Sequence, residues 1–161
     1  MEYKELIAQE NSSVSVDSPG IISDSENISR ILFLPNHYKN DKVAPNAFEQ
    51  VFQQTGMSVL RQNDDFSKSL DKTINIVTTN NSSKRYKGHV SASVLDIRTV
   101  MFSTFRIFYV LDTATEDRKA HADVYTTRKS LVGFPKEIIN DLITSRIFRV
   151  FKTLYIEKDN N

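Results

Sequence analysis

The sequence predicts an α+β fold: a mostly antiparallel sheet of about six strands, a long C-terminal helix and one or two short helices. Short runs rich in β-branched and aromatic residues recur along the chain and are bounded by polar turn residues. One segment near the C-terminus instead repeats its apolar residues with helical spacing. The length of 161 residues is enough for one domain with a hydrophobic core.

Residues 1–27 are expected to form an acidic, Ser-rich flexible tail. They contain six carboxylates and one lysine, a net charge of −5; the whole chain has a net charge of +1, which leaves +6 for residues 28–161. Such a segment buries too little surface to offset the entropy that it loses on ordering. The alternative is an amphipathic turn of Tyr3, Leu6 and Ile7 that docks on a partner. We therefore place the single α+β domain at residues 28–161.

The first half of this domain contains three runs typical of strands, at residues 29–34, 57–61 and 73–78. After Pro45, apolar residues have the spacing of one face of a short helix, and Gly56 stands where a C-terminal glycine cap is expected. Phe66 and Leu70 lie four residues apart, which indicates a helical turn before the third strand.

The second half begins with alternating polar and apolar residues at 88–94, after which Leu95 and Ile97 change the apolar phase. We interpret the change as a bulge or bend in a strand; the alternative is a helix, because the same apolar residues also fit a 3.6-residue period. Residues 105–111 are apolar on both faces, which predicts a central strand. A polar hairpin-type loop then leads to a further strand at 120–127.

The C-terminal helix is the clearest helical signal. Pro135 occupies the favoured first position, and an apolar stripe of about four turns runs from Ile138 to Leu154. Glu137 lies near the positive end of the expected helix dipole, and basic residues lie toward the negative end. A helix of this kind packed on a mostly antiparallel sheet gives the α+β domain.

Composition excludes several functional classes. With no cysteine, the chain cannot have a disulfide scaffold, a thiolate zinc site or a cysteine nucleophile. It contains no GxxxxGK[ST], GxGxxG or GxSxG motif, and we expect no cofactor. The N-terminus has no secretory signal and the apolar runs are too short to span a membrane, so we expect a cytoplasmic protein without membrane association. The Asn-, Ser-, Ile- and Lys-rich usage is typical of AT-rich bacterial or phage genomes.

The candidates for acid–base chemistry are the three histidines, His37, His89 and His121. Residues two apart on a strand share a face, so His121 and Asp123 are expected to project together. They could act as a base and its orienting carboxylate, or as two ligands of a metal ion. His89 would join them if its strand lies nearby, and such a set of two histidines and one carboxylate would suit Zn²⁺ or Fe²⁺. The plainer interpretation is that Asp123 only accepts a hydrogen bond from His121. We predict no metal site from this spacing.

Arg61, Arg98 and Arg106 lie in or beside apolar segments, so each must find a partner or reach water. The plain interpretation pairs Arg61 with Asp64 or Asp65, and Arg98 with the aspartate two residues before it. In a pocket the same arginines would bind phosphate or carboxylate groups. Arg61 is therefore the candidate anion clamp beside the catalytic candidates.

A basic segment that includes one aromatic residue is the candidate nucleic-acid-binding site; it consists of Lys84, Arg85, Tyr86 and Lys87. A solvated loop is the plainer interpretation, because the domain carries only a moderate positive charge and has no zinc-finger, homeodomain or RRM signature.

These features lead to three functional hypotheses. The first is a non-enzymatic accessory or adaptor domain that acts through protein–protein contacts in a larger assembly. The second is a hydrolase on a phosphate-containing substrate, a nucleotide or nucleic acid, that uses the His/Asp cluster. The third is a nucleic-acid-binding module. A protein partner is expected under the first hypothesis and nucleic acid under the third.

Overall fold

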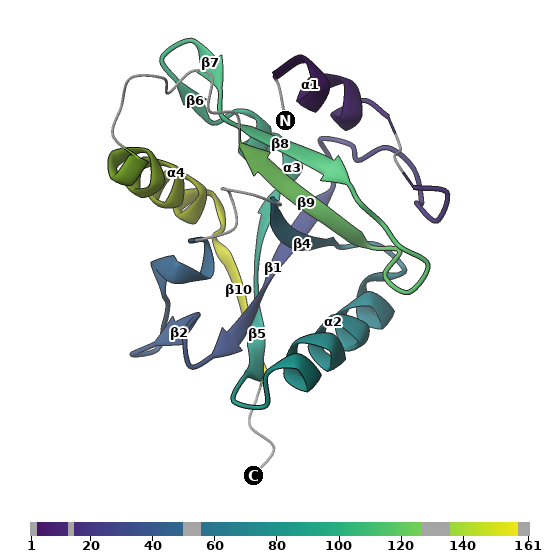
Figure 1. Cartoon of the computed structure of the whole chain (residues 1–161), viewed down its shortest axis with the longest axis vertical. Helices are drawn as coiled ribbons and strands as arrows, with labels where there is room; N and C mark the ends of the chain where they lie inside the picture. Colours follow the sequence, from purple (N-terminus) through teal and green to yellow (C-terminus); the bar gives the residue numbers. More distant parts are fainter. Residues whose placement is uncertain (1–2, 13–14, 50–55, 127–135, 158–161) are drawn as a thin grey trace.

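The computed structural model describes residues 3–12, 15–49, 56–126 and 136–157 (Figure 1). At its centre lies a six-stranded sheet in which each neighbouring pair is antiparallel. In spatial order the strands are β10 (Thr153–Ile156), β5 (Arg85–Ser93), β1 (Asn27–Leu34), β4 (Met57–Arg61), β9 (His121–Thr126) and β8 (Phe108–Asp112). The predicted α+β fold with a mostly antiparallel sheet is confirmed.

Helices and two short hairpins surround this sheet. Among the described residues, the helices are α1 (Tyr3–Glu10), α2 (Phe66–Asn80), α3 (Val94–Arg98) and α4 (Lys136–Val150), and η1 (Pro45–Ala47) is a 3₁₀ turn. The hairpins pair β2 (Tyr38–Lys39) with β3 (Lys42–Val43), and β6 (Met101–Phe102) with β7 (Phe105–Arg106). Within the described residues, none of the helices has the length and apolar character needed to cross a membrane.

The two faces of the sheet are covered by different elements. Successive residues of a strand point to opposite faces, and Val59 and Leu60 accordingly belong to different clusters of buried residues. Val59 contributes to the larger core, which also includes residues of η1, α3 and α4. Leu60 packs with Ile31 and Phe33 beneath α2. Figure 1 shows α2 and α4 on different sides of the strands.

The predicted strand at 73–78 is wrong, because these residues belong to the second half of α2. β-branched residues in this segment favour a strand, but their apolar members continue the helical spacing that Phe66 and Leu70 begin. Ile74 and Val77 pack with them against the sheet. Burial of one helix face therefore outweighs the local strand preference.

The change of apolar phase after residue 93 marks the end of a strand, not a bulge within it. β5 ends at Ser93, whose side chain accepts a hydrogen bond from the Asp96 N–H and so caps α3.

The C-terminal helix also ends earlier than predicted, at Val150, and Leu154 lies in β10. The predicted short helix after Pro45 is described only as η1, since 50–55 lie outside the described residues, as does Pro135.

The segment predicted as a central strand lies at the edge of the sheet. β8 pairs only with β9 in the six-stranded sheet, yet all five of its residues are buried. Phe108 and Val110 face the main core, whereas Tyr109 and Leu111 pack with Leu6 of α1. The apolar character of both faces thus reflects a helix that covers an edge strand, and not a central position.

The N-terminal segment also differs from the expected flexible tail. Leu6 is fully buried, and Ile22 lies in the main core. Glu10 is 5% exposed and its carboxylate forms ion pairs with Arg98 and Arg106. The carboxylates that make this segment hydrophilic therefore also attach it to the rest of the domain, because they form ion pairs with arginines there.

The sheet opens between β1 and β4, and this opening positions the site described next. The two strands share only the register pairs Ile28–Arg61 and Ser29–Leu60. Beyond Ser29, β1 stays paired with β5 as far as Leu34, while β4 follows β9. The two halves of the sheet consequently diverge, and α2 packs over this part of the sheet through Ile74 and Val77.

Candidate functional site

Ser58 and His121 form a short hydrogen bond beside this gap. The two side chains come from neighbouring strands, β4 and β9, in which Ser58 is paired with Asp123 and Leu60 with His121. Their Oγ and Nε2 atoms are 2.7 Å apart. His121 is only 7% exposed, so water does not compete strongly for its ring nitrogens.

The second ring nitrogen of His121 defines the direction of this bond. Nδ1 lies 3.1 Å from the Thr113 carbonyl oxygen, and a carbonyl can only accept a hydrogen bond. We therefore assign the proton of the neutral ring to Nδ1, which leaves the Nε2 lone pair to accept from the Ser58 hydroxyl. Burial lowers the pKa of His121, with Arg118 acting in the same direction and Asp123 opposing it. The ring is thus neutral at neutral pH and able to act as a base.

Asp123 reaches His121 through Thr113 and not directly. The distance from His121 Nδ1 to Asp123 Oδ2 is 4.0 Å, too long for a hydrogen bond. Thr113 Oγ1 lies 2.9 Å from Nδ1 and donates to Asp123 Oδ2 at 2.8 Å. The predicted convergence of His121 and Asp123 on one face is thus found, but the simple hydrogen bond between them is not.

Arg30 bridges the opening between the two halves of the sheet. Its guanidinium donates from Nε to the Ala47 carbonyl at 2.8 Å and from NH1 to the Ser58 carbonyl at 2.9 Å. Burial lowers its pKa to about 10, while the nearby Asp123 carboxylate opposes the shift. Arg30 therefore remains a cation at neutral pH and holds the backbone of the serine in place.

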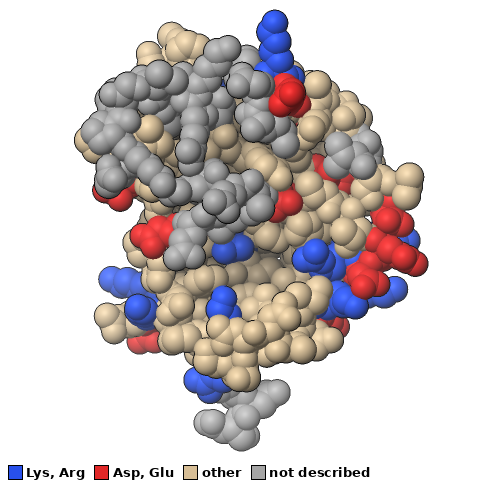
Figure 2. Space-filling view, in the orientation of Figure 1, with Lys and Arg blue, Asp and Glu red and all other residues tan. Residues whose placement is uncertain are grey.

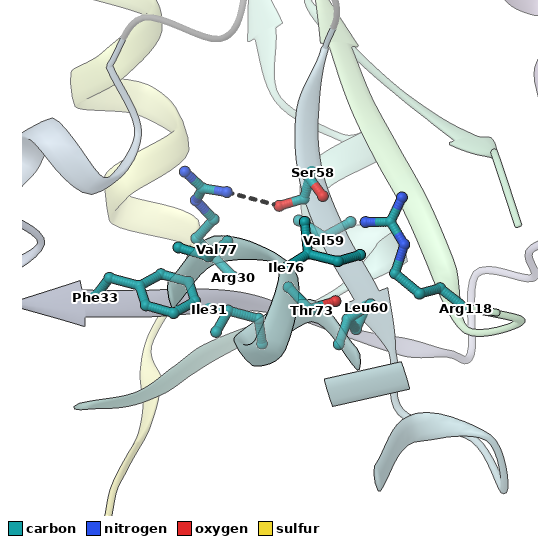
Figure 3. A pocket seen from close by; sticks show the side chains of 10 residues that line it. All are labelled: Arg30, Ile31, Phe33, Ser58, Val59, Leu60, Thr73, Ile76, Val77 and Arg118. Carbon is teal, nitrogen blue, oxygen red and sulfur yellow. Dashed lines mark hydrogen bonds between the residues drawn. The ribbon is translucent and has the colours of Figure 1, made fainter. Parts of the chain in front are cut away.

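A cavity of about 120 Å³ lies between the sheet and α2 at this point (Figure 3). Its apolar wall includes Ile31, Leu60 and Val77. Figure 3 shows Ser58 at the upper edge of the cluster, between Arg30 on its left and Arg118 on its right. A hydroxyl with a neutral base therefore lies between two cations on the wall of a small, mainly apolar cavity.

His89 does not join this cluster. It lies on β5, and β1 and β4 separate that strand from β9. Its ring stacks on Tyr155 at a centroid distance of 4.9 Å and contacts Phe66 edge-on. Burial lowers its pKa. The predicted three-residue cluster of two histidines and Asp123 is therefore not formed.

Arg61 is not available as an anion clamp. Its side chain is 5% exposed and makes a two-pronged ion pair with Glu26, at 2.8 and 2.9 Å. A third bond runs from NH1 to the Gly20 carbonyl. The predicted partners Asp64 and Asp65 are thus replaced by a carboxylate of the N-terminal segment. Arg98 likewise pairs with Glu10 and Asp24 and not with its near neighbour in the sequence.

The basic segment divides between surface and interior. Arg85 is exposed, whereas Tyr86 is half-buried, packs edge-on against Phe33 and shares a hydrogen bond with His89. Burial raises the pKa of Tyr86 to about 12, with nearby acidic groups acting in the same direction. Tyr86 is therefore a packed ring, and Lys84, Arg85 and Lys87 are the members of the segment that bring charge to this end of the domain.

Four residues of the site were not among the sequence candidates: Arg30, Ser58, Thr113 and Arg118. Ser58 and Arg30 lie inside predicted strands, where a lone serine or arginine carries no distinctive pattern. The strand pairing of Ser58 with Asp123 would have indicated the site, but strand pairing cannot be read from a single sequence. Within the described residues, no cluster of three or more His, Asp or Glu side chains could hold a metal ion.

His37 should make the stability of the domain depend on pH. Its Nδ1 accepts a hydrogen bond from the Phe33 N–H, and burial, together with Arg30 and Lys84, lowers its pKa from 6.5 to about 4. Between these two values the unfolded chain binds more protons than the folded one, so the free energy of unfolding falls as the pH falls from 6.5 to 4. Denaturant titrations at several pH values should show that the free energy of unfolding depends less steeply on pH in His37→Asn than in the wild type. An unchanged pH dependence would contradict the assignment of this effect to His37.

Comparison with known proteins gives no match: no family model, curated protein or solved structure is significantly similar to this chain. Function is therefore inferred from the geometry of the site.

Proposed function

We propose that the opening between β1 and β4 is the active site of a hydrolase for a small phosphate-containing substrate. The observation that carries the proposal is the 2.7 Å contact between Ser58 Oγ and His121 Nε2 on the wall of a cavity flanked by two arginines. Paired hydroxyl and imidazole groups are the usual elements of an activated nucleophile. Arginine supplies planar donors that match a phosphate.

The reaction begins with attack of Ser58 Oγ on phosphorus as its proton passes to His121 Nε2. The bond from phosphorus to the leaving oxygen breaks, and the imidazolium returns the proton to that oxygen. Water then attacks the phosphoserine with His121 again as base, which releases phosphate and regenerates the hydroxyl. Thr113 and Asp123 hold the ring in the required tautomer and stabilise its charged form.

A panel of p-nitrophenyl phosphate, bis-p-nitrophenyl phosphate and nucleotides tests the proposal. We expect Ser58→Ala and His121→Gln each to reduce hydrolysis at least about 100-fold, because either change removes the activated nucleophile. The matched control is Ser91→Ala: Ser91 is a buried, hydrogen-bonded serine of the same sheet, but it lies on β5 and bonds to Ser29 and Gln62. This variant should keep wild-type activity.

Two results would contradict the hydrolase proposal: a folded wild-type protein that cleaves none of these compounds, or a Ser58→Ala variant that cleaves them at the wild-type rate. The first result would favour the accessory-domain hypothesis.

This accessory-domain function is the second candidate. It is supported by exposed apolar side chains of α3 and of the β6–β7 hairpin, Leu95, Met101 and Phe105, which are 42–51% exposed.

A further inference from the structure

One end of the domain gathers cations from two elements that are far apart in the sequence. We call it the basic end and define it as Lys39, Lys42, Lys84, Arg85 and Lys87. The first two belong to the β2–β3 hairpin. Of the other three, Lys84 immediately precedes β5, and Arg85 and Lys87 lie at the start of this strand. The two elements are adjacent, since Lys87 Nζ lies 5.9 Å from the centre of the Tyr38 ring.

Most of these cations are not neutralised within the described residues. No described carboxylate forms an ion pair with Lys39, Lys42, Lys84 or Arg85. Arg61, Arg98 and Arg106, by contrast, are each paired with a carboxylate of the N-terminal segment. Asp41 in the hairpin turn and Glu157 beside Lys87 offset only part of the charge. Figure 2 shows basic side chains at the lower left and at the bottom of the molecule, where Figure 1 places β2 and the start of β5.

An exposed aromatic ring borders the basic end. Tyr155 of β10 is 54% exposed although its ring stacks on His89. The strand continues beside the basic segment, because the Glu157 N–H donates to the Lys87 carbonyl at 2.9 Å. Tyr155 is therefore two residues from the point where β10 meets Lys87, a distance of about 7 Å along a strand.

We propose that the basic end and Tyr155 together bind single-stranded nucleic acid. The four cations that form no ion pair with a described carboxylate, Lys39, Lys42, Lys84 and Arg85, attract the phosphate backbone. The supported, half-exposed ring of Tyr155 offers a stacking surface for an unpaired base. A duplex keeps its bases stacked on one another and cannot use the ring in this way. An acidic protein segment would use the cations but not the ring. The surface does not depend on the hydrolase proposal, because none of its residues lines the cavity at Ser58.

Fluorescence anisotropy with a labelled 12-nucleotide oligo-dT tests this surface. Wild-type affinity should fall steeply with salt, by about 0.7 in log K per log unit of salt for each phosphate contact. The quadruple variant Lys39→Ala/Lys42→Ala/Lys84→Ala/Arg85→Ala should bind at least about 10-fold more weakly with a shallower salt dependence. Tyr155→Ala should weaken binding by roughly 5- to 150-fold at an unchanged salt dependence, because it removes stacking alone.

A matched quadruple variant removes four lysines from other surfaces, Lys4, Lys68, Lys72 and Lys119, and should bind as the wild type does. The proposal is overturned if this control loses as much affinity as the basic-end variant, or if the wild type shows no salt-dependent binding. Equal binding of a duplex, or equal competition by polyglutamate, would also overturn it in favour of general attraction for polyanions. Circular dichroism of each variant verifies the fold.

Discussion

Glu10→Ala is expected to lower the free energy of unfolding by about 3–5 kcal/mol, because it removes the buried carboxylate that two arginines share. The Glu10 carboxylate accepts from Arg98 at 2.9 Å, forms an ion pair with Arg106 and accepts from the Val110 N–H at 2.8 Å. Its side chain is 5% exposed and that of Arg98 is 14% exposed. Removing the carboxylate therefore takes the ion-pair partner from Arg106 and the acceptor from the Val110 N–H, and it leaves Arg98 with Asp24 as its remaining described carboxylate.

Urea titrations of the wild type, Glu10→Ala and Lys4→Ala measure this effect. Lys4 lies on the same helix but is exposed, so its substitution should change the free energy of unfolding by less than about 0.5 kcal/mol. A loss below about 1 kcal/mol for Glu10→Ala would show that α1 is not coupled to the stability of the sheet. Strong coupling would show that the N-terminal segment belongs to the folded domain.

Gly88→Ala should have the second large effect, because a side chain at this position meets the neighbouring strand. Gly88 has φ +152°, and a Cβ built there would lie 2.1 Å from the Tyr155 carbonyl oxygen. Backbone cannot move aside as a flexible side chain can, so β10 would have to separate from β5. We expect this substitution to destabilise the domain and to raise hydrogen exchange in β10.

Gly20→Ala is the matched control for Gly88→Ala. Gly20 also has a positive φ, +117°, but a Cβ there meets nothing within 4 Å. Backbone strain of about 1–3 kcal/mol is therefore common to the two variants, and the clash is not. The decrease in the free energy of unfolding for Gly88→Ala should exceed the decrease for Gly20→Ala by at least about 2 kcal/mol. Equal losses would mean that strain alone accounts for both.

The sequence was most informative where burial and local preference agree. The strands at Ser29, Met57, His121 and the apolar run near Val110 were all recognised, because alternation or continuous apolar character marks them. Prediction failed where tertiary contacts outweigh local preference, as in α2, where Ile74 lies on the buried face of a helix in spite of its β-branched side chain. A single sequence does not give the spatial order of the strands, so the apolar residues of β8 predict a central strand although β8 is an edge strand covered by α1.

The candidate site was only partly predictable for the same reason. Residues two apart on one strand can be placed on one face from sequence alone, and His121 and Asp123 do lie together. Ser58, in contrast, comes from another strand, and only the pairing of β4 with β9 brings it to the imidazole. Arg61 shows the converse: a lone arginine on an apolar strand looks like a ligand-binding group until its distant partner, Glu26, is known.

The bond between Glu10 and Val110 bears on self-association. β8 is a terminal strand of the sheet, and the outward N–H groups of such a strand can pair with a second molecule and start aggregation. α1 lies against this strand, and its last residue accepts the hydrogen bond of one of these groups. Detachment of α1 would thus expose a pairing edge as well as an apolar face, so loss of the N-terminal segment should favour aggregation before it favours complete unfolding.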